Sequence, residues 1–408
     1  MTETSGRTLP VDPRLVQLGE VFTPATPIQD ADLFSGRSGL LLRIADAVSQ
    51  RGMHCILFGE RGVGKTSLAN ILPSFISATG TELIVASINC DTTDDYASLI
   101  HKLLQEISIV QRIQSVGFGE DFTFDQNPLS NSLPDAPRPN DLRLLLQSID
   151  ANPLLILDEF DRVADQDSVR LMSDTIKTLS DRAVPATIVL VGVADNVDGL
   201  LREHQSIERC LTQVRMPRMT AEELTEIIDN GLQRVNMAVD DSVRWYIPAV
   251  SQGYPHYAHL LALDAARHAL RDGRDVVNRD DIELTIGDAI TRTEHSIQNS
   301  YLEAIYSANR TALYEQVLLA CALADTDDLN YFSAQAVREP LSRIMGRPQN
   351  IPAFARHLDA FCRQERGPVL AKEGQSRRYR YRFVLPLLRP YVLLQGISSG
   401  KISAEDLR

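Results

Sequence analysis

The stretch at positions 59–66 of this 408-residue chain decides its fold class: Gly59-Glu60-Arg61-Gly62-Val63-Gly64-Lys65-Thr66. It matches G-x-x-x-x-G-K-[ST] at every position, and Ser67 follows it. A short apolar run, Cys55–Phe58, precedes the stretch and a helical pattern follows it. Strand, glycine turn and helix in this order form a phosphate cradle, because glycines let backbone N–H groups converge on phosphate oxygens. The sequence therefore predicts a nucleotide site with residues 59–67 as its binding loop.

A second apolar run, Leu154–Leu157, ends in two carboxylates, Asp158 and Glu159. In enzymes with a phosphate-binding loop such a strand lies beside the strand of the loop, so its C-terminal end faces the phosphates. We expect Thr66 and Asp158 to hold Mg²⁺, and Lys65 to reach the β- and γ-phosphates of ATP. Glu159 would be the general base that polarises the attacking water. The alternative is an Asp-Glu pair that only caps a strand, and the loop upstream argues against it.

Composition limits the class of protein. Hydrophobic residues make up 44% and charged residues 23% of the chain, as in a globular protein. The five cysteines are scattered, without a C-x-x-C pair, so we expect a reducing, cytoplasmic setting and no zinc site. No apolar signal segment begins the chain, and no apolar run approaches the about 18 residues of a membrane span, so no membrane partner is expected.

The net charge of −13 is unevenly distributed. Residues 338–390 hold 12 basic and four acidic residues, a net charge of +8, while residues 1–337 carry −21. A basic C-terminal segment on an acidic body is typical of a domain that binds a polyanion such as duplex DNA. The same distribution also fits a contact between the basic segment and the acidic body.

Strand and helix patterns alternate through residues 31–217, which predicts an α/β domain with a parallel sheet. Residues 1–30 are polar and proline-rich and are expected to form an extended N-terminal arm. The segment from Tyr96 to about Ile113 has a helical pattern, and residues 115–140 have the composition of a long loop. Only helical patterns follow Pro217, so residues 218–309 are predicted to be an all-helical domain with a linker helix.

Residues 310–395 show three helical patterns and then a strand–turn–strand pattern, which together predict a winged helix, with a tail at 396–408. Ile351–Gln364 would be its recognition helix, and the turn at 372–378 the tip of its wing. The candidate DNA contacts are Arg356, Arg363, Lys372, Arg377, Arg378 and Arg380. The alternative is a winged helix that binds protein, including the acidic body of the chain itself.

The order of these motifs resembles the AAA+ ATPases. The run Asp158-Glu159-Phe160-Asp161 and the C-terminal winged helix resemble the origin-recognition (initiator) branch. The stretches Gly192–Asn196 and His204–Arg209 also resemble bacterial ATPases that assist transposition. The resemblance implies ATP hydrolysis with Mg²⁺, and assembly into a homo-oligomer or with related AAA+ subunits.

The resemblance also assigns roles to single residues. Arg37, in a Gly-Arg pair, matches a residue beside the adenine, although it is equally explained as a surface arginine at a helix start. Either Asp195 or Asn196 matches sensor 1, which orients the hydrolytic water. Arg209 matches the arginine finger that reaches the γ-phosphate of a neighbouring subunit, with Arg202, Arg215 and Arg218 as competitors.

One position departs from the pattern of the relatives. Many of them carry Gly-x-x-Arg at the start of the third helix of the all-helical domain, the sensor 2 motif. Here the matching residues are Gly253-Tyr254-Pro255-His256. His256 would hydrogen-bond a phosphate, or it only begins a helix, which we slightly favour.

Three functions remain open from the sequence. The first is an ATP-hydrolysing AAA+ protein that couples its nucleotide state to DNA binding or assembly through the winged helix. The alternative is a STAND-type signalling or defence switch whose winged helix contacts protein. STAND proteins usually carry sensor and effector modules, and none is apparent in this sequence, which favours the first function. A transposition-type regulator that oligomerises on DNA is a third hypothesis.

Overall fold

The computed structural model describes residues 12–114, 122–195, 197–201, 207–308, 313–375 and 378–407. The chain forms two compact units. The first, here called the sheet unit, is Pro27–Pro217. The second, here called the helical unit, consists of Met1–Thr26 and Arg218–Arg408.

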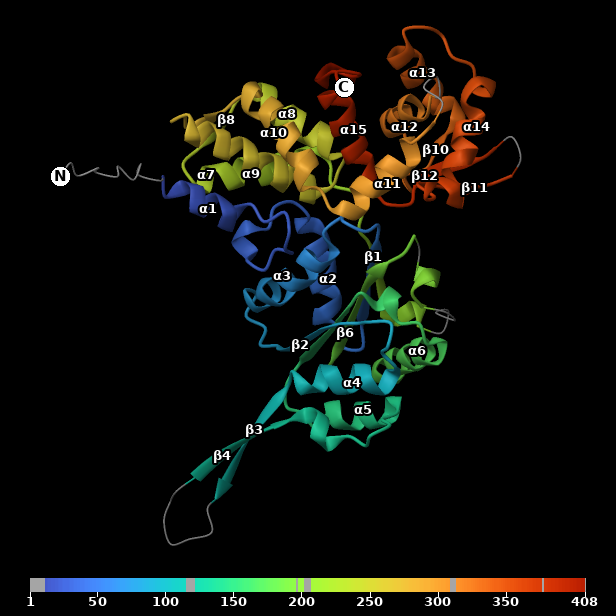
Figure 1. Ribbon diagram of the computed structural model, residues 1–408. Helices are drawn as coiled ribbons and strands as arrows, with labels where there is room; N and C mark the ends of the chain where they lie inside the picture. Colours follow the sequence, from blue (N-terminus) through green and yellow to red (C-terminus); the bar gives the residue numbers. More distant parts are fainter. Residues whose placement is uncertain are drawn as a thin grey trace, which may run out of the picture. The chain divides into compact units, whose positions relative to one another are not determined.

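A parallel five-stranded sheet in the order β2-β5-β6-β1-β7 organises the sheet unit (Figure 1). Its strands are β1 His54–Gly59, β2 Ile84–Asn89, β5 Pro153–Asp158, β6 Thr187–Val193 and β7 Leu211–Arg215. Strands β1 and β5 are buried at every residue, as expected for strands covered by helices on both faces. The predicted α/β class is therefore confirmed. Strand β7 was not predicted, because five residues with polar Thr212 and Gln213 give little apolar signal.

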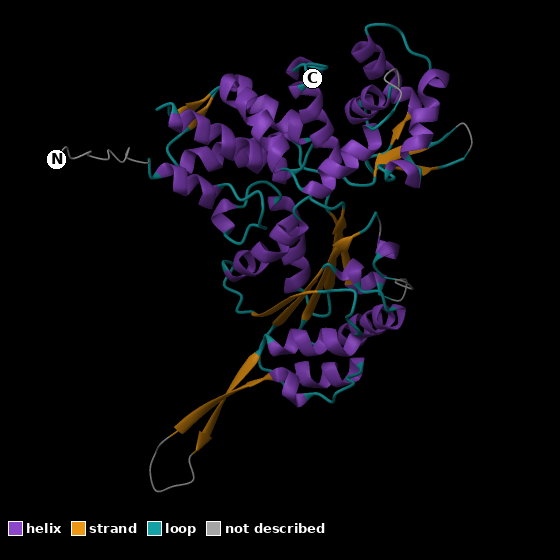
Figure 2. Cartoon of the chain, viewed as in Figure 1, coloured by secondary structure: helices purple, strands orange, loops and turns teal. Residues whose placement is uncertain are grey.

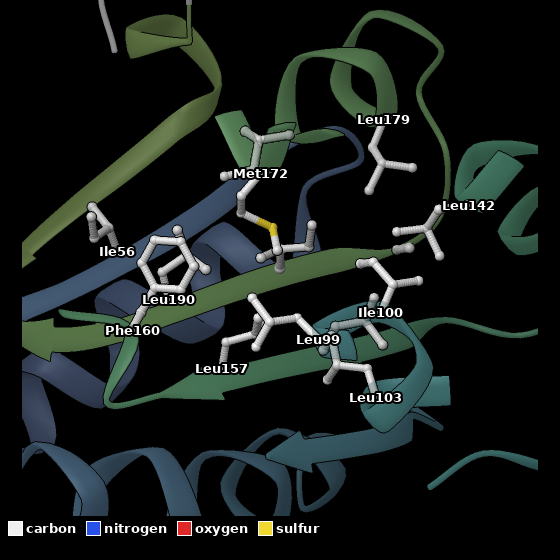
Figure 3. Close-up of a cluster of buried hydrophobic side chains, with 14 of the residues drawn as sticks. Ile56, Leu99, Ile100, Leu103, Leu142, Leu157, Phe160, Met172, Leu179 and Leu190 are labelled. Atoms are coloured by element: carbon white, nitrogen blue, oxygen red, sulfur yellow. The ribbon is translucent and has the colours of Figure 1, made fainter. Parts of the chain in front are cut away.

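The helices of this unit form a layer on each face of the sheet. They are α2 Ser38–Ser49, α3 Lys65–Ser77, α4 Tyr96–Gln105, α5 Pro139–Gln147 and α6 Gln166–Asp181. Figure 3 shows side chains of α4 and α6 meeting one face of the strands, where Phe160 joins the same buried cluster. The labelled members of that cluster are Ile56, Leu99, Ile100, Leu103, Leu142, Leu157, Phe160, Met172, Leu179 and Leu190. This core fixes β5, β6 and β1 in that order, with their C-terminal ends at one edge. The predicted pairing of β5 with the strand of the loop is therefore wrong, because β6 lies between them.

The segment between α4 and α5 differs from the prediction. Helix α4 ends at Gln105, and β3 Ser108–Gln114 pairs antiparallel with β4 Phe122–Pro128. The short 3₁₀ helix η2 Leu129–Ser132 follows. Part of the predicted helix and part of the predicted loop therefore form a hairpin, which extends away from the sheet (Figure 1). Three β-branched residues, Ile109, Val110 and Ile113, favour strand over helix here.

The first part of the helical unit is an array of helices closed by the N-terminal segment. Its elements are α1 Arg14–Val21, α7 Ala221–Arg234, α8 Asp241–Ser251, α9 Pro255–Arg271 and α10 Arg279–Arg292, with the short strands β8 Ala238–Val239 and β9 Val276–Val277. The predicted extended arm is wrong for residues 14–21, because α1 packs on α7 and α9. Phe22 explains this packing: it is 1% exposed and lies against Gly231, where an added Cβ would be 2.3 Å from its ring.

The second part of the helical unit has the element order of a winged helix (Figure 2). Its helices are α12 Tyr314–Leu323, α13 Ala334–Met345 and α14 Ile351–Phe361, and α11 His295–Ile305 precedes them. Strands β10 Phe332–Ser333, β11 Leu370–Glu373 and β12 Arg380–Phe383 pair in the order β10-β12-β11. A last helix, α15 Leu388–Ser398, packs on both α10 and α12. Residues 396–398, predicted as tail, thus belong to a helix that joins the two parts of this unit.

The buried His259 is expected to make the helical unit less stable in acid. It is 5% exposed, neither ring nitrogen has a hydrogen-bond partner among the described residues, and burial lowers its pKa to about 4. An unfolded histidine takes up its proton near pH 6.5, so the folded state loses stability as the pH falls from 6.5 towards 4. By linkage the loss due to His259 is about 2 kcal/mol at pH 5. Urea unfolding at pH 7 and pH 5 should show a smaller difference for His259→Leu, and an unchanged one for the exposed control His295→Leu.

Candidate nucleotide site

The loop at 59–66 has the backbone that a phosphate cradle needs. Gly59, Gly62 and Gly64 have φ angles of 153°, 86° and 94°, in the region that glycine adopts without strain. An added Cβ at Gly59 would lie 2.4 Å from the carbonyl oxygen of Met216, so no larger residue fits. Helix α3 begins at Lys65, directly after the loop. Its first N–H groups have no partner within the helix, which makes this position suited to an anion.

Lys65 is a buried cation held by carbonyl groups. Its Nζ donates hydrogen bonds to the carbonyl oxygens of Gly59, at 3.0 Å, and Glu60, at 2.7 Å. The residue is 8% exposed, and burial lowers its pKa to about 8, opposed by the charges of Asp161 and Asp158. A buried ammonium group bonded to neutral oxygens is better satisfied by an anion. Lys65 therefore fits a phosphate group at this loop.

Asp158 ends strand β5 beside the loop. Its Oδ1 accepts a hydrogen bond of 2.7 Å from the N–H of Glu159. Asp158 is 6% exposed, and burial raises its pKa, while the Thr66 hydroxyl acts to lower the pKa of this carboxyl. Carboxylate and hydroxyl oxygens, with phosphate oxygens, are the ligands that Mg²⁺ prefers. Thr66 and Asp158 thus fit the predicted metal.

Glu159 stands on a strained turn at the end of β5. Its φ of 55° is left-handed, which is unfavourable for a residue with a side chain. The 3₁₀ turn η3 Phe160–Arg162 follows, and Nη1 of Arg162 lies 2.7 Å from Oε2 of Glu159. About half of the Glu159 side chain is exposed. Glu159 therefore lies half exposed, directly after Asp158, at the edge of the sheet.

Asp161 also belongs to this edge, although no role of its own was predicted for it. Its Oδ1 accepts a hydrogen bond of 2.7 Å from the N–H of Val193, the last residue of β6. Gly59 of the loop pairs with Val193 in the sheet register. A signal was present in the sequence, because Asp161 follows Glu159 by two residues, but its partner lies 32 residues away.

The remaining predicted nucleotide residues are placed as follows. Val63 is 1% exposed, Arg61 is exposed, and Oγ of Ser67 accepts a hydrogen bond from the N–H of Ile28 at 3.1 Å. Asp195 lies exposed two residues after β6, and Asn196 lies outside the described residues. Arg37 is 5% exposed, and its Nη2 lies 2.5 Å from the carbonyl oxygen of Pro217.

Two further predicted residues make specific contacts. Arg209, in the 3₁₀ turn η6 Glu208–Cys210, lies 2.5 Å from Asp181, and 73% of its side chain is exposed. His256 belongs to the helical unit, where its Nδ1 lies 2.7 Å from the carbonyl oxygen of Pro24. Of the competitors of Arg209, Arg202 lies outside the described residues.

The predicted DNA contacts of the winged helix divide into two groups. Nζ of Lys372 lies 2.6 Å from Asp359, and Arg380 pairs with Asp327 and Glu373 at 2.8 and 3.2 Å. Arg356, Arg363 and Arg378 are exposed and form no ion pair with another described residue, while Arg377 lies outside the described residues.

Residues 338–390 carry the net charge of +8, but two of their arginines form hydrogen bonds that stabilise the fold. Arg366 donates hydrogen bonds to the carbonyl oxygens of Ala304 and Tyr306 at 2.8 and 2.7 Å. The buried Arg389 donates to the carbonyl oxygens of Ala322 and Ala324, at the end of α12. The charge count alone therefore overstates the basic surface that is available to a polyanion.

None of the helices in the described ranges is both long and apolar enough to cross a lipid bilayer.

Comparison with known proteins identifies the family and the fold. The family model described as "Novel STAND NTPase 1" matches residues 25–262. The ORC2 protein of Aeropyrum pernix, solved as ADPNP-ADP complexes, matches with a TM-score of 0.50 and 16% identity over 94% of this chain and 98% of that chain. No curated protein matches this sequence. The fold is therefore like that of this ORC2 protein, as the resemblance to the origin-recognition branch implied, whereas the likeness to transposition ATPases stays a prediction.

Two other solved structures match at lower TM-scores. The Walker-type ATPase of Pyrococcus abyssi gives 0.49, with 15% identity over 91% of this chain and 99% of that chain. The ORC1 protein of Aeropyrum pernix in complex with DNA gives 0.48, with 13% identity over 92% and 95%.

Proposed function

The chain belongs to the Novel STAND NTPase 1 family, and from this premise we propose that it binds and hydrolyses ATP with Mg²⁺ to drive a conformational switch. The observation that carries the proposal is the set of groups at one edge of the sheet. A buried lysine at the loop, a hydroxyl that acts on the pKa of a buried carboxylate, and a second carboxylate on a strained turn lie together there. This set suits phosphoryl transfer to water.

In the proposed reaction, Lys65 exchanges its bonds to loop carbonyls for bonds to phosphate oxygens. Thr66 and Asp158 would hold Mg²⁺, which would offset the negative charge of the phosphates. Glu159 takes a proton from the water that attacks the γ-phosphorus, the bond from that phosphorus to its bridging oxygen breaks, and ADP leaves. Asp195 or Asn196 would orient this water, and Arg209 would act on the γ-phosphate of a neighbouring subunit.

Arg37 and His256 have no part in this proposal. Each of their side chains already contacts a backbone carbonyl, at Pro217 and Pro24 respectively. A contact to adenine or phosphate would require these bonds to be exchanged.

We place the output of the switch in protein contacts of the winged helix. Helix α15 packs on both α10 and α12, so a movement of the helical domain in response to ATP would carry the winged helix with it. Of the predicted DNA contacts, Lys372 and Arg380 are paired with nearby acids, which reduces the free positive charge. Membership in the Novel STAND NTPase 1 family also supports protein contacts as the output.

Duplex DNA is the second candidate for the output. Three predicted contacts, Arg356, Arg363 and Arg378, are exposed and form no ion pair within the described part of the chain. They come from α14, the residues just after it, and the wing, which are the elements that a winged helix presents to DNA.

A binding experiment with duplex DNA at low and rising salt, with and without ATP, separates the two outputs. With protein contacts as the output, we expect the wild type to bind DNA no better than Arg356→Glu/Arg378→Glu. The matched control is Arg51→Glu/Arg182→Glu, which changes the same charge at exposed positions of the sheet unit. Salt-sensitive binding that the control keeps and the first variant loses would instead establish DNA as the partner.

A further inference from the structure

The turn that carries Glu159 is joined to the end of β6 by one side chain. Oδ1 of Asp161 accepts the N–H of Val193 at 2.7 Å, and η3 packs beside β6. Gly192 makes room for this contact, because an added Cβ there would lie 3.0 Å from Oδ1 and 3.2 Å from the N of Asp161. The same Cβ would lie 2.5 Å from Leu200, so the strand end is closely packed on two sides.

The position of this hydrogen bond matters because the turn is strained. Glu159 has a φ of 55°, so its backbone needs neighbouring contacts to keep this conformation. Phe160, 1% exposed, holds the turn from the core, and Asp158 bonds the N–H of Glu159 at 2.7 Å. Asp161 supplies the contact on the side of β6. Figure 3 shows Phe160 close to Leu190 of β6, on the same side of the sheet.

Val193, which donates this hydrogen bond, lies next to a second candidate residue in the sequence. Asp195 follows Val193 by two residues, and both are exposed at the same edge. A single carboxylate thus connects the turn bearing the proposed base to the strand end bearing the candidate sensor 1. A shift of about 1 Å in such groups is enough to lower a rate by about 100-fold.

We propose that Asp161 is a positioning residue, whose hydrogen bond to Val193 sets Glu159 and the end of β6 in register for hydrolysis. This inference rests on the proposed function. Asp161 acts through Glu159 and the strand end, and it does not itself take the proton.

The test compares Asp161→Ala, Asp161→Asn and Glu159→Gln. Asp161→Ala removes the acceptor, so kcat should fall about 10- to 100-fold with KM changed less than about threefold. Asp161→Asn keeps an oxygen for the N–H of Val193 and should recover most of kcat. Added to Glu159→Gln, Asp161→Ala should cost little more, because both changes affect one group. The matched control is Asp165→Ala, which removes the helix-capping carboxylate of α6 and should leave kcat unchanged.

Amide hydrogen exchange at Val193 tests the bond without relying on turnover. Exchange should be faster in Asp161→Ala and near the wild-type rate in Asp161→Asn. Unchanged exchange in Asp161→Ala, an Asn variant as slow in turnover as the Ala variant, or a full further loss in the double variant would overturn the inference. Absence of turnover in the wild type would refute the proposed function itself, and the positioning role with it.

Discussion

Replacing Glu159 with glutamine is expected to slow ATP turnover by about 100- to 10,000-fold while ATP binding changes only a few-fold. Glutamine has nearly the shape of glutamate but does not accept a proton from water. The groups that would hold the nucleotide keep their contacts, because the hydrogen bonds of Lys65 and Asp158 are to backbone groups and not to the Glu159 side chain. Phosphate release under single-turnover and steady-state conditions measures the first effect, and calorimetric titration with ATP the second.

Arg162 loses its ion-pair partner in this variant, so a control for the loss of an exposed carboxylate is needed. Its ion pair with Glu159 joins two half-exposed side chains, and such pairs contribute little to stability, so the variant should fold normally. Glu82→Gln removes an exposed carboxylate elsewhere in the sheet unit and should leave turnover unchanged. Wild-type turnover in Glu159→Gln would exclude Glu159 as the base and reopen the choice among the carboxylates of this edge.

Local patterns in the sequence predicted the parts of the molecule that depend on neighbouring residues. The loop at 59–66, the strand ending at Asp158 and the helices α12, α13 and α14 are continuous stretches with strong periodicity, and each lies within a few residues of its predicted place. The parallel direction of the strands follows from the rule that parallel strands are joined by helices, but their order does not, because β6 lies between the two strands that were predicted to be neighbours. Such features are set by the residues that form them.

Contacts between distant residues were out of reach of the same reasoning. Asp161 meets Val193 across 32 residues, and Arg380 meets Asp327 across 53. Helix α1 forms because Phe22 fits against Gly231, a pairing that no periodicity shows. The charge count of the winged helix failed to separate Arg389, buried against carbonyl oxygens, from Arg356, which is exposed. Residue type alone does not state which partner a side chain finds in the fold.

Arg209 offers the sharpest test of whether subunits share their sites. Its side chain is 73% exposed, and its contact to Asp181 is a surface ion pair, so Arg209→Ala should leave the stability of the chain nearly unchanged. If the guanidinium serves the γ-phosphate of a neighbour, turnover should nevertheless fall by about 1,000-fold, in the range of other arginine fingers. Asp181→Ala removes the same ion pair but keeps the arginine, and it should turn over ATP at the wild-type rate.

Mixing two inactive variants decides between action within one chain and action across an interface. Arg209→Ala keeps Glu159, and Glu159→Gln keeps Arg209, so a mixed interface unites an intact base with an intact arginine. Turnover of the mixture should then exceed the sum of the separate variants, and the excess should grow with total protein concentration as assemblies form. A mixture no more active than its parts would place Arg209 in its own subunit's site or outside the reaction. Arg215→Ala, the described competitor on β7, would then be the next variant to mix.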